Sequence, residues 1–148
     1  MVTDTSWKLH HIGIVVRDMA KAIERYRLMG IGPFEAPTNP LDVVERKFLY
    51  KPIDVSKMKL LVKFADIGLS KLELLQPLEG ESLWKEFLDT QGEGLSHLGF
   101  TVDNIEREEA KLLKEGFRLL YRSKYRNGGG ALYFDTGVGS AAMEIIQY

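Results

Sequence analysis

The stretch "HHIGIVV" at His10–Val16 returns later in the chain as "SHLGFTV" at Ser96–Val102, so that His11 is aligned with His97. Both stretches read as strands, and each is followed by an amphipathic segment. The match continues through an acidic or amide residue and a glycine, in the pairs Asp18/Asn104 and Gly30/Gly116. Such residues are typical of the first and last positions of a helix. The sequence therefore predicts two copies of a strand–helix unit.

A second pair of segments matches further along each copy. "KLELLQP" from Lys71 is aligned with "AMEIIQY" from Ala142, which pairs Glu73 with Glu144 and Gln76 with Gln147. Strand and turn signals precede both segments, and Phe64 is aligned with Phe134. We expect a single domain over residues 1–148, with a first module at about 7–78, a linker helix at about 80–93 and a second module at about 94–148.

The first copy is longer than the second, mainly because of "EAPTNPLDVVERKFLYKP" at residues 35–52. This insertion predicts a long loop and an extra or extended strand, and residues 33–52 are expected to form a wall or lid of a pocket. The linker helix is expected from about Ser82, with Trp84, Phe87 and Leu88 on one side. The inward stripes of the two repeated helices are expected to be Met19, Ile23 and Tyr26, and Ile105, Leu112 and Leu113.

Composition narrows the class of protein. The 148 residues are 45% hydrophobic with a net charge of -1, and Lys and Arg are interspersed with Asp and Glu, which argues against a nucleic-acid-binding surface. No apolar run approaches the roughly 20 residues that cross a bilayer, and the first residues do not resemble a secretion signal. We therefore expect a cytoplasmic protein with no membrane or nucleic-acid partner. The chain contains no cysteine, so a metal site would use His, Asp, Glu or Gln.

The paired histidines and glutamates are the candidate site. Strand alternation places His11 and Gly13 on one face and His10 on the other, so His10 is expected to lie outside the site. The glycines leave room for a ligand or another backbone. Glu73 and Glu144 each interrupt an apolar strand, and a buried carboxylate needs a partner such as a cation. If the halves pack about a pseudo-twofold axis, the candidate ligands of one divalent ion (Zn, Co, Ni, Mn or Fe) are His11, Glu73, His97 and Glu144.

A structural interpretation stands beside this one. A single histidine at the start of a strand is more often hydrogen-bonded within the core, and a glutamate in an edge strand is usually solvated. All four residues occupy equivalent positions of the two copies, His11 with His97 and Glu73 with Glu144, and this coincidence favours the metal site. The glycines at 128–130 lack the lysine and hydroxyl residue of a phosphate loop and predict a turn. The preceding Lys124, Tyr125 and Arg126 read as a solvated loop, with contact to an anionic substrate tail as the alternative.

From "LHHIGIVVRDMAKAIERY" to "MEIIQY" the chain resembles the vicinal oxygen chelate superfamily, which includes glyoxalases, bleomycin-resistance proteins and dioxygenases. The resemblance implies an α+β fold in which two tandem βαβββ modules form a cupped mixed sheet around a metal site. His11 and His97 match the ligands on the first strands, and Glu73 and Glu144 match those on the last strands. The stretches "LELLQPLEGESLWKEFLDTQGEGLSHLGFTVDNI" and "GFRLLYRSKYRNGGG" are most similar to methylmalonyl-CoA epimerases.

The chain departs from the epimerase pattern at two positions. Glu73 stands where epimerases often carry Gln, and a glutamate at this position is closer to glyoxalase I. The glutamate base that epimerases carry on the preceding strand is missing from "SKMKLLVKFADIG", and Glu45 in the insertion is a candidate substitute.

The resemblance implies a divalent-metal-dependent isomerase, epimerase or lyase that stabilises an enolate or enediolate during proton transfer next to a carbonyl. Glu144 or Glu73 would be the catalytic base, and the partner would be a small carbonyl or acyl-thioester substrate. The resemblance also implies a homodimer. Two arrangements of the site stay open, one formed within a single chain and one formed across the dimer. Three alternatives stay open: a glyoxalase I (lactoylglutathione lyase)-like activity, an iron-dependent ring-cleaving dioxygenase using His11, His97 and Glu144, and a non-enzymatic drug-sequestering protein.

Overall fold

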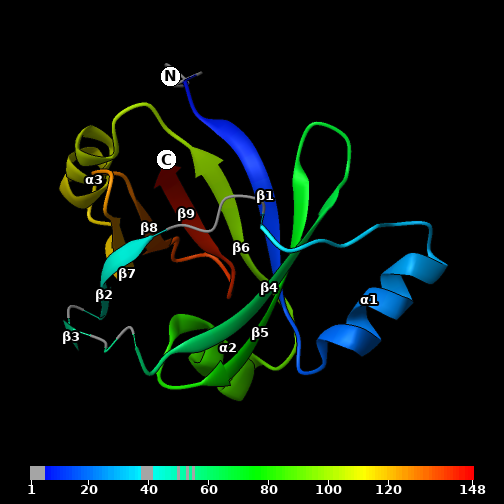
Figure 1. The fold of residues 1–148 in the computed structure, drawn as a ribbon. Helices are drawn as coiled ribbons and strands as arrows, with labels where there is room; N and C mark the ends of the chain where they lie inside the picture. The colour runs from blue at the N-terminus through cyan, green and yellow to red at the C-terminus, as the bar shows by residue number, and fades with distance from the viewer. Residues whose placement is uncertain (1–5, 38–41, 50, 53, 55) are drawn as a thin grey trace.

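A computed structural model describes residues 6–37, 42–49, 51–52, 54 and 56–148. Within them the strands form one curled sheet in the order β3-β2-β7-β8-β9-β6-β1-β5-β4 (Figure 1). The strands are β1 (Lys8–Val15), β2 (Val43–Phe48), β3 (Lys51–Pro52), β4 (Lys59–Asp66), β5 (Lys71–Glu79), β6 (Gly94–Thr101), β7 (Arg118–Tyr125), β8 (Gly130–Asp135) and β9 (Ala142–Gln147). The helices are α1 (Met19–Leu28), α2 (Leu83–Gln91) and α3 (Ile105–Lys114).

The two repeated strands meet at the middle of the sheet. β1 pairs antiparallel with β6, and each pairs in parallel with the last strand of its own half, β1 with β5 and β6 with β9. In the central register Gly13 lies opposite His97 and His11 lies opposite Gly99. This arrangement confirms the predicted α+β fold with a cupped mixed sheet, and it brings the two histidine-bearing strands side by side.

The insertion in the first half crosses to the other half of the sheet. β2 pairs antiparallel with β7 instead of β4, while Glu35 forms an isolated bridge with Phe64 on β4. The predicted extra strand is therefore present, and its partner comes from the second copy. Residues 38–41 and 50 of the predicted pocket wall lie outside the described residues.

The helix between the halves closes one end of the curled sheet (Figure 1). α2 begins after Ser82, whose Oγ accepts a hydrogen bond from the Lys85 backbone N–H at 3.0 Å. Trp84 is buried and packs edge-on against Tyr121 and Tyr133, with ring centroids 5.2 and 5.7 Å away. Such aromatic contacts add specificity to a large buried apolar area, so they fix α2 against the inner face of the sheet.

The repeated helices carry matching caps. The side chains of Asp18 and Asn104 accept from backbone N–H groups three residues on, as predicted. Gln76 in β5 and Gln147 at the end of β9 also accept from the first N–H groups of α1 and α3, each at 2.9 Å. The repeated glutamines therefore tie each helix start to the last strand of its own half.

One predicted core position of α3 is wrong. Ile105 is buried and Leu112 packs beside it, but Leu113 is 43% exposed. Glu108 takes the inward position instead, three residues after Ile105, where it forms ion pairs with Arg107 and Lys111. In the part of the chain that the structure describes, none of the helices has the length and hydropathy to cross a membrane.

Candidate metal centre

The two histidines cross over glycines of the opposite strand. A Cβ atom at Gly13 would lie 2.1 Å from Cε1 of His97, and one at Gly99 would lie 2.2 Å from Cε1 of His11. The space that each glycine leaves is therefore filled by the imidazole of the other copy. Because carbon atoms normally approach to about 3.5 Å, no larger residue fits at either position without moving a histidine.

The structure brings the four predicted ligands together. The Nε2 atoms of His11 and His97 are 3.0 Å apart, and Oε2 of Glu144 lies 2.7 Å from the first and 3.3 Å from the second. Oε1 of Glu73 lies 3.1 Å from His97 Nε2 and 3.7 Å from His11 Nε2. All four side chains are buried, with Glu73 the most accessible at 8%.

These residues fit a divalent cation. His11, His97 and Glu144 each offer one ligand atom, and the three atoms lie within 4.8 Å of one another. Two facing Nε2 atoms can share at most one proton between them, and Oε1 of Glu73 is buried with no hydrogen-bond partner among the described residues. A cation between the side chains would satisfy all of these atoms at once. The nitrogen and oxygen donors suit Zn, Co, Ni, Mn or Fe.

Without a metal, a proton on His11 stabilises the cluster of carboxylates and imidazoles. Burial by itself lowers the pKa of His11, but the hydrogen bond to Glu144 and the charges of Glu144 and Glu73 outweigh it and raise the pKa to about 9. Burial by itself raises the pKa of Glu144, but its contacts with His11, His97 and Tyr133 lower it overall. The buried carboxylate therefore stays ionised beside a protonated imidazole, and a bound metal would take the place of that proton.

His10 does not lie on the outer face, so this prediction is wrong. The register of β1 and β6 shifts between Leu9 and His11, and this bulge breaks the strict alternation of side chains. The His10 ring lies 5.1 Å from the His11 ring, with the two Nδ1 atoms 2.9 Å apart, and it lines a cavity. The sequence held a signal for this position, because a polar residue precedes the aligned histidine too. That residue, Ser96, contacts Nδ1 of His97 as His10 contacts Nδ1 of His11.

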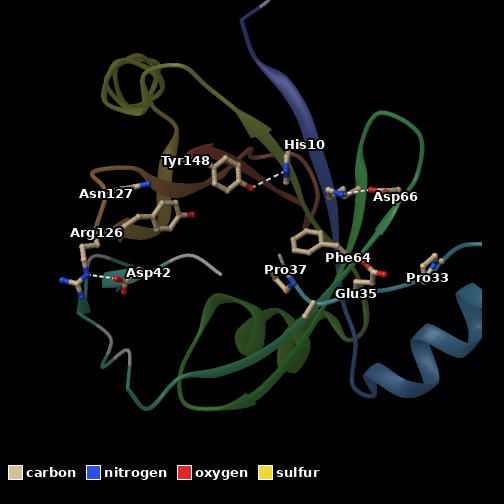
Figure 2. Close-up of a pocket in the computed structure, with 14 residues that line it drawn as sticks. His10, Pro33, Glu35, Pro37, Asp42, Phe64, Asp66, Arg126, Asn127 and Tyr148 are labelled. Carbon is tan, nitrogen blue, oxygen red and sulfur yellow. Dashed lines mark hydrogen bonds and ion pairs between the residues drawn. The ribbon is translucent and has the colours of Figure 1, made fainter. Parts of the chain in front are cut away.

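The cavity lies beside the buried cluster and has a volume of about 1000 Å³. Its walls are His10, Gly32, Pro33, Glu35, Ala36, Pro37, Asp42, Phe64, Asp66, Lys71, Tyr125, Arg126, Asn127 and Tyr148. Figure 2 shows His10, Phe64 and Tyr148 around one part of it and the insertion residues along another. Part of the predicted wall therefore lines this pocket, namely Pro33, Glu35, Ala36, Pro37 and Asp42, whereas residues 43–49 do not.

The predicted solvated loop at residues 124–126 is wrong in part, because Lys124 and the buried Tyr125 end β7, and this strand end and the loop after it contribute to the cavity. Tyr125 and Arg126 line it, whereas Lys124 does not belong to its walls. Arg126 pairs with Asp42 at 2.6 Å, and Lys71 pairs with Asp66 at 2.6 Å (Figure 2). Both cations of the cavity wall are thus engaged with carboxylates.

Two further expectations need correction. Glu45 lies opposite Lys124, its Oε1 is 3.6 Å from Lys47 Nζ, and it does not line the cavity, so it is no substitute for the missing glutamate base. Phe64 is not the structural equivalent of Phe134. Phe64 lies opposite Glu73, and Tyr133 lies opposite Glu144.

Comparison with known proteins agrees with this architecture. The model of the Glyoxalase/Bleomycin resistance protein/Dioxygenase superfamily matches residues 10–134. No curated protein matches the chain by sequence. A hypothetical protein from Bacillus halodurans C-125 has 22% identity and a TM-score of 0.70, covering 97% of this chain and 96% of its own. Methylmalonyl-CoA epimerase from Mycobacterium tuberculosis has 21% identity and a TM-score of 0.67, with 99% and 91% covered.

A third similar structure contains a ligand. It is a methylmalonyl-CoA epimerase from Streptomyces coelicolor in complex with 2-nitronate-propionyl-CoA, with 21% identity and a TM-score of 0.63 over 94% of this chain and 95% of that one. At these identities the likeness concerns the fold.

Proposed function

The chain belongs to the Glyoxalase/Bleomycin resistance protein/Dioxygenase superfamily, and on that premise we propose that it is a divalent-metal-dependent isomerase, epimerase or lyase acting on a carbon next to a carbonyl. The observation that carries the proposal is the convergence of two buried histidines and two buried glutamates beside an open cavity. His11, His97 and Glu144 would hold the ion together with Glu73. Such an ion, when bound, supplies Lewis-acid stabilisation of the negative charge that develops on a carbonyl oxygen as the neighbouring C–H loses its proton.

Glu73 is the better candidate for the base that takes this proton. Glu144 is bound by His11 at 2.7 Å and hydrogen-bonded by Tyr133. Glu73 Oε1 lies near both imidazoles but has no hydrogen-bond partner among the described residues, and the residue opposite it, Phe64, offers no hydrogen bond and lines the cavity. The Glu73 carboxylate therefore loses fewer contacts than that of Glu144 when it moves away from the cluster to take a proton. Return of the proton to the other face of the carbon gives an epimer, and return to the neighbouring carbon gives an isomer.

For the substrate we propose an acyl-thioester of the methylmalonyl-CoA type, supported by the fold likeness to epimerases whose structures contain such ligands. A glyoxalase I-like lyase is the second candidate, because a carboxylate stands at position 73. The proposed enzyme is a homodimer.

Deuterium wash-in from D₂O tests the function. Protein loaded with Co²⁺, Ni²⁺ or Zn²⁺ is incubated with methylmalonyl-CoA or with the hemithioacetal of methylglyoxal and glutathione. We expect exchange of the carbon-bound proton in one of them, and a loss of about 10²- to 10⁴-fold in the Glu73→Gln variant, which keeps an oxygen ligand but removes the base.

Glu79→Gln is the matched control, because Glu79 is an exposed glutamate at the end of the same strand. It should exchange deuterium like the wild type. A protein that binds none of these metals, or a Glu73→Gln variant with full exchange, would contradict the proposal.

A further inference from the structure

The residue before each ligand histidine contacts the ring nitrogen that points away from the other ligands. His10 Nδ1 lies 2.9 Å from His11 Nδ1, and Ser96 Oγ lies 2.6 Å from His97 Nδ1. The two contacts occupy equivalent positions of the repeat, although the side chains that make them differ. Both Nε2 atoms face the cluster, so in each histidine one nitrogen serves the centre and the other serves its chain neighbour.

Binding a metal through Nε2 fixes where the ring proton lies. A neutral imidazole carries one proton, so an imidazole that gives its Nε2 lone pair to a metal carries that proton on Nδ1. His11 then donates from Nδ1 to Nδ1 of His10, and His97 donates to Oγ of Ser96. Because Nδ1 of His10 accepts, its own proton lies on Nε2, which points toward the hydroxyl of Tyr148 at 3.4 Å.

We propose that His10 and Ser96 are positioning residues for the metal centre, which hold the Nδ1 protons of His11 and His97 and thereby aim both Nε2 atoms at the ion. The inference rests on the metal-dependent function proposed above. Acceptors of this kind fix the tautomer and the ring orientation of metal-binding histidines. In this chain they come from the strand itself, one residue before each ligand, where the register between β1 and β6 shifts.

The two positioning residues differ in what else they touch. Ser96 is buried, so its contact is closed to solvent. His10 lines the cavity, and its ring packs 5.5 Å from the ring of Tyr148 (Figure 2). A molecule in the cavity therefore meets His10 directly and can disturb the hydrogen bond to His11, whereas His97 is shielded. His11 is therefore the ligand histidine whose hydrogen bond a molecule in the cavity can change.

Cobalt binding by the full chain tests the inference without any substrate. Variants His10→Phe and Ser96→Ala remove one acceptor each, and we expect each to weaken Co²⁺ binding about 10- to 100-fold. His10→Asn places an amide oxygen near the position of Nδ1 and should restore most of the affinity. Ser123→Ala, another buried serine in the sheet, is the matched control and should bind Co²⁺ like the wild type.

The ring protons give a readout that a merely structural role would not change. In the Co²⁺-loaded protein the two Nδ1 protons should appear as separate, paramagnetically shifted, slowly exchanging NMR signals. His10→Phe should lose or broaden one signal and Ser96→Ala the other. Wild-type affinity and both intact signals in these two variants would overturn the inference, whereas a wild type that binds no metal would overturn the proposed function instead.

Discussion

Replacing Gly13 by alanine should remove a metal ligand that lies on a different strand. The new Cβ would lie 2.1 Å from Cε1 of His97, 2.4 Å from Nε2 and 2.6 Å from Nδ1. Since carbon atoms pack at about 3.5 to 4.0 Å, the imidazole must move by roughly 1.5 Å. Metal–ligand distances tolerate about 0.2 Å, so Nε2 can no longer reach an ion held by the other side chains.

The cost should appear mainly in metal affinity. Disturbing a neighbour of a ligand lowers affinity about 10- to 100-fold, so displacing the ligand itself should cost about 100-fold or more. The metal-free protein should lose only about 1 to 3 kcal/mol of unfolding free energy, the usual result of overpacking a core. Gly99→Ala should behave in the same way, because its Cβ would meet His11.

The assay compares Co²⁺ affinity by competition titration with stability by urea unfolding of the metal-free protein. Gly130→Ala is the matched control. Its Cβ would lie 2.5 Å from the carbonyl oxygen of Ser123, so it strains another strand of the same sheet without meeting a histidine. The reasoning is refuted if Gly13→Ala and Gly99→Ala fold and bind Co²⁺ like the wild type, or if Gly130→Ala loses as much affinity as they do.

Three further predictions concern the proton at the centre and the packing behind it. Metal affinity should rise with pH up to about 9, because His11 must release its proton to bind, and a flat titration between pH 6 and 9 would contradict this. The raised pKa of His11 should stabilise the metal-free protein fully below pH 6.5 and be lost as pH rises through about 9. Urea unfolding should show a decline of at most about 3 kcal/mol that His11→Asn abolishes. Trp84→Ala should cost about 3 to 5 kcal/mol by the same assay, and the half-buried Phe87→Ala clearly less.

The meeting of the four candidate ligands was predictable from sequence because the repeat marks them twice. His11 and His97 precede glycines at the same spacing, and Glu73 and Glu144 interrupt equivalent apolar strands. Each position alone is ambiguous, but a fold built from two copies brings equivalent positions to one axis. The strand–helix units and their caps follow from the same repeat, since local side-chain patterns indicate both, whereas the cupped sheet was implied by the family resemblance.

The features that sequence reasoning missed depend on contacts between distant segments. The place of His10 depends on a bulge against β6, and strict alternation cannot show a bulge. The alignment of Phe64 with Phe134 failed because the turn after β8 is longer than the turn after β4, so Tyr133 takes the place opposite Glu144. The pairing of β2 with β7 is a choice of partner across the halves, and no local pattern in the insertion specifies it.

The repeat supplies two nearly equal sets of ligands, and their unequal surroundings divide the work between the halves. Around the second-half ligands the neighbours Ser96 and Tyr133 are buried, so they hold His97 and Glu144 in place. Around the first-half ligands the equivalent neighbours His10 and Phe64 line the cavity. If the site holds an ion as proposed, a substrate in the cavity would approach it over the first half. In the proposed reaction, the carbon that loses its proton would then lie next to Glu73, which is the more exposed of the two carboxylates and has the fewer contacts.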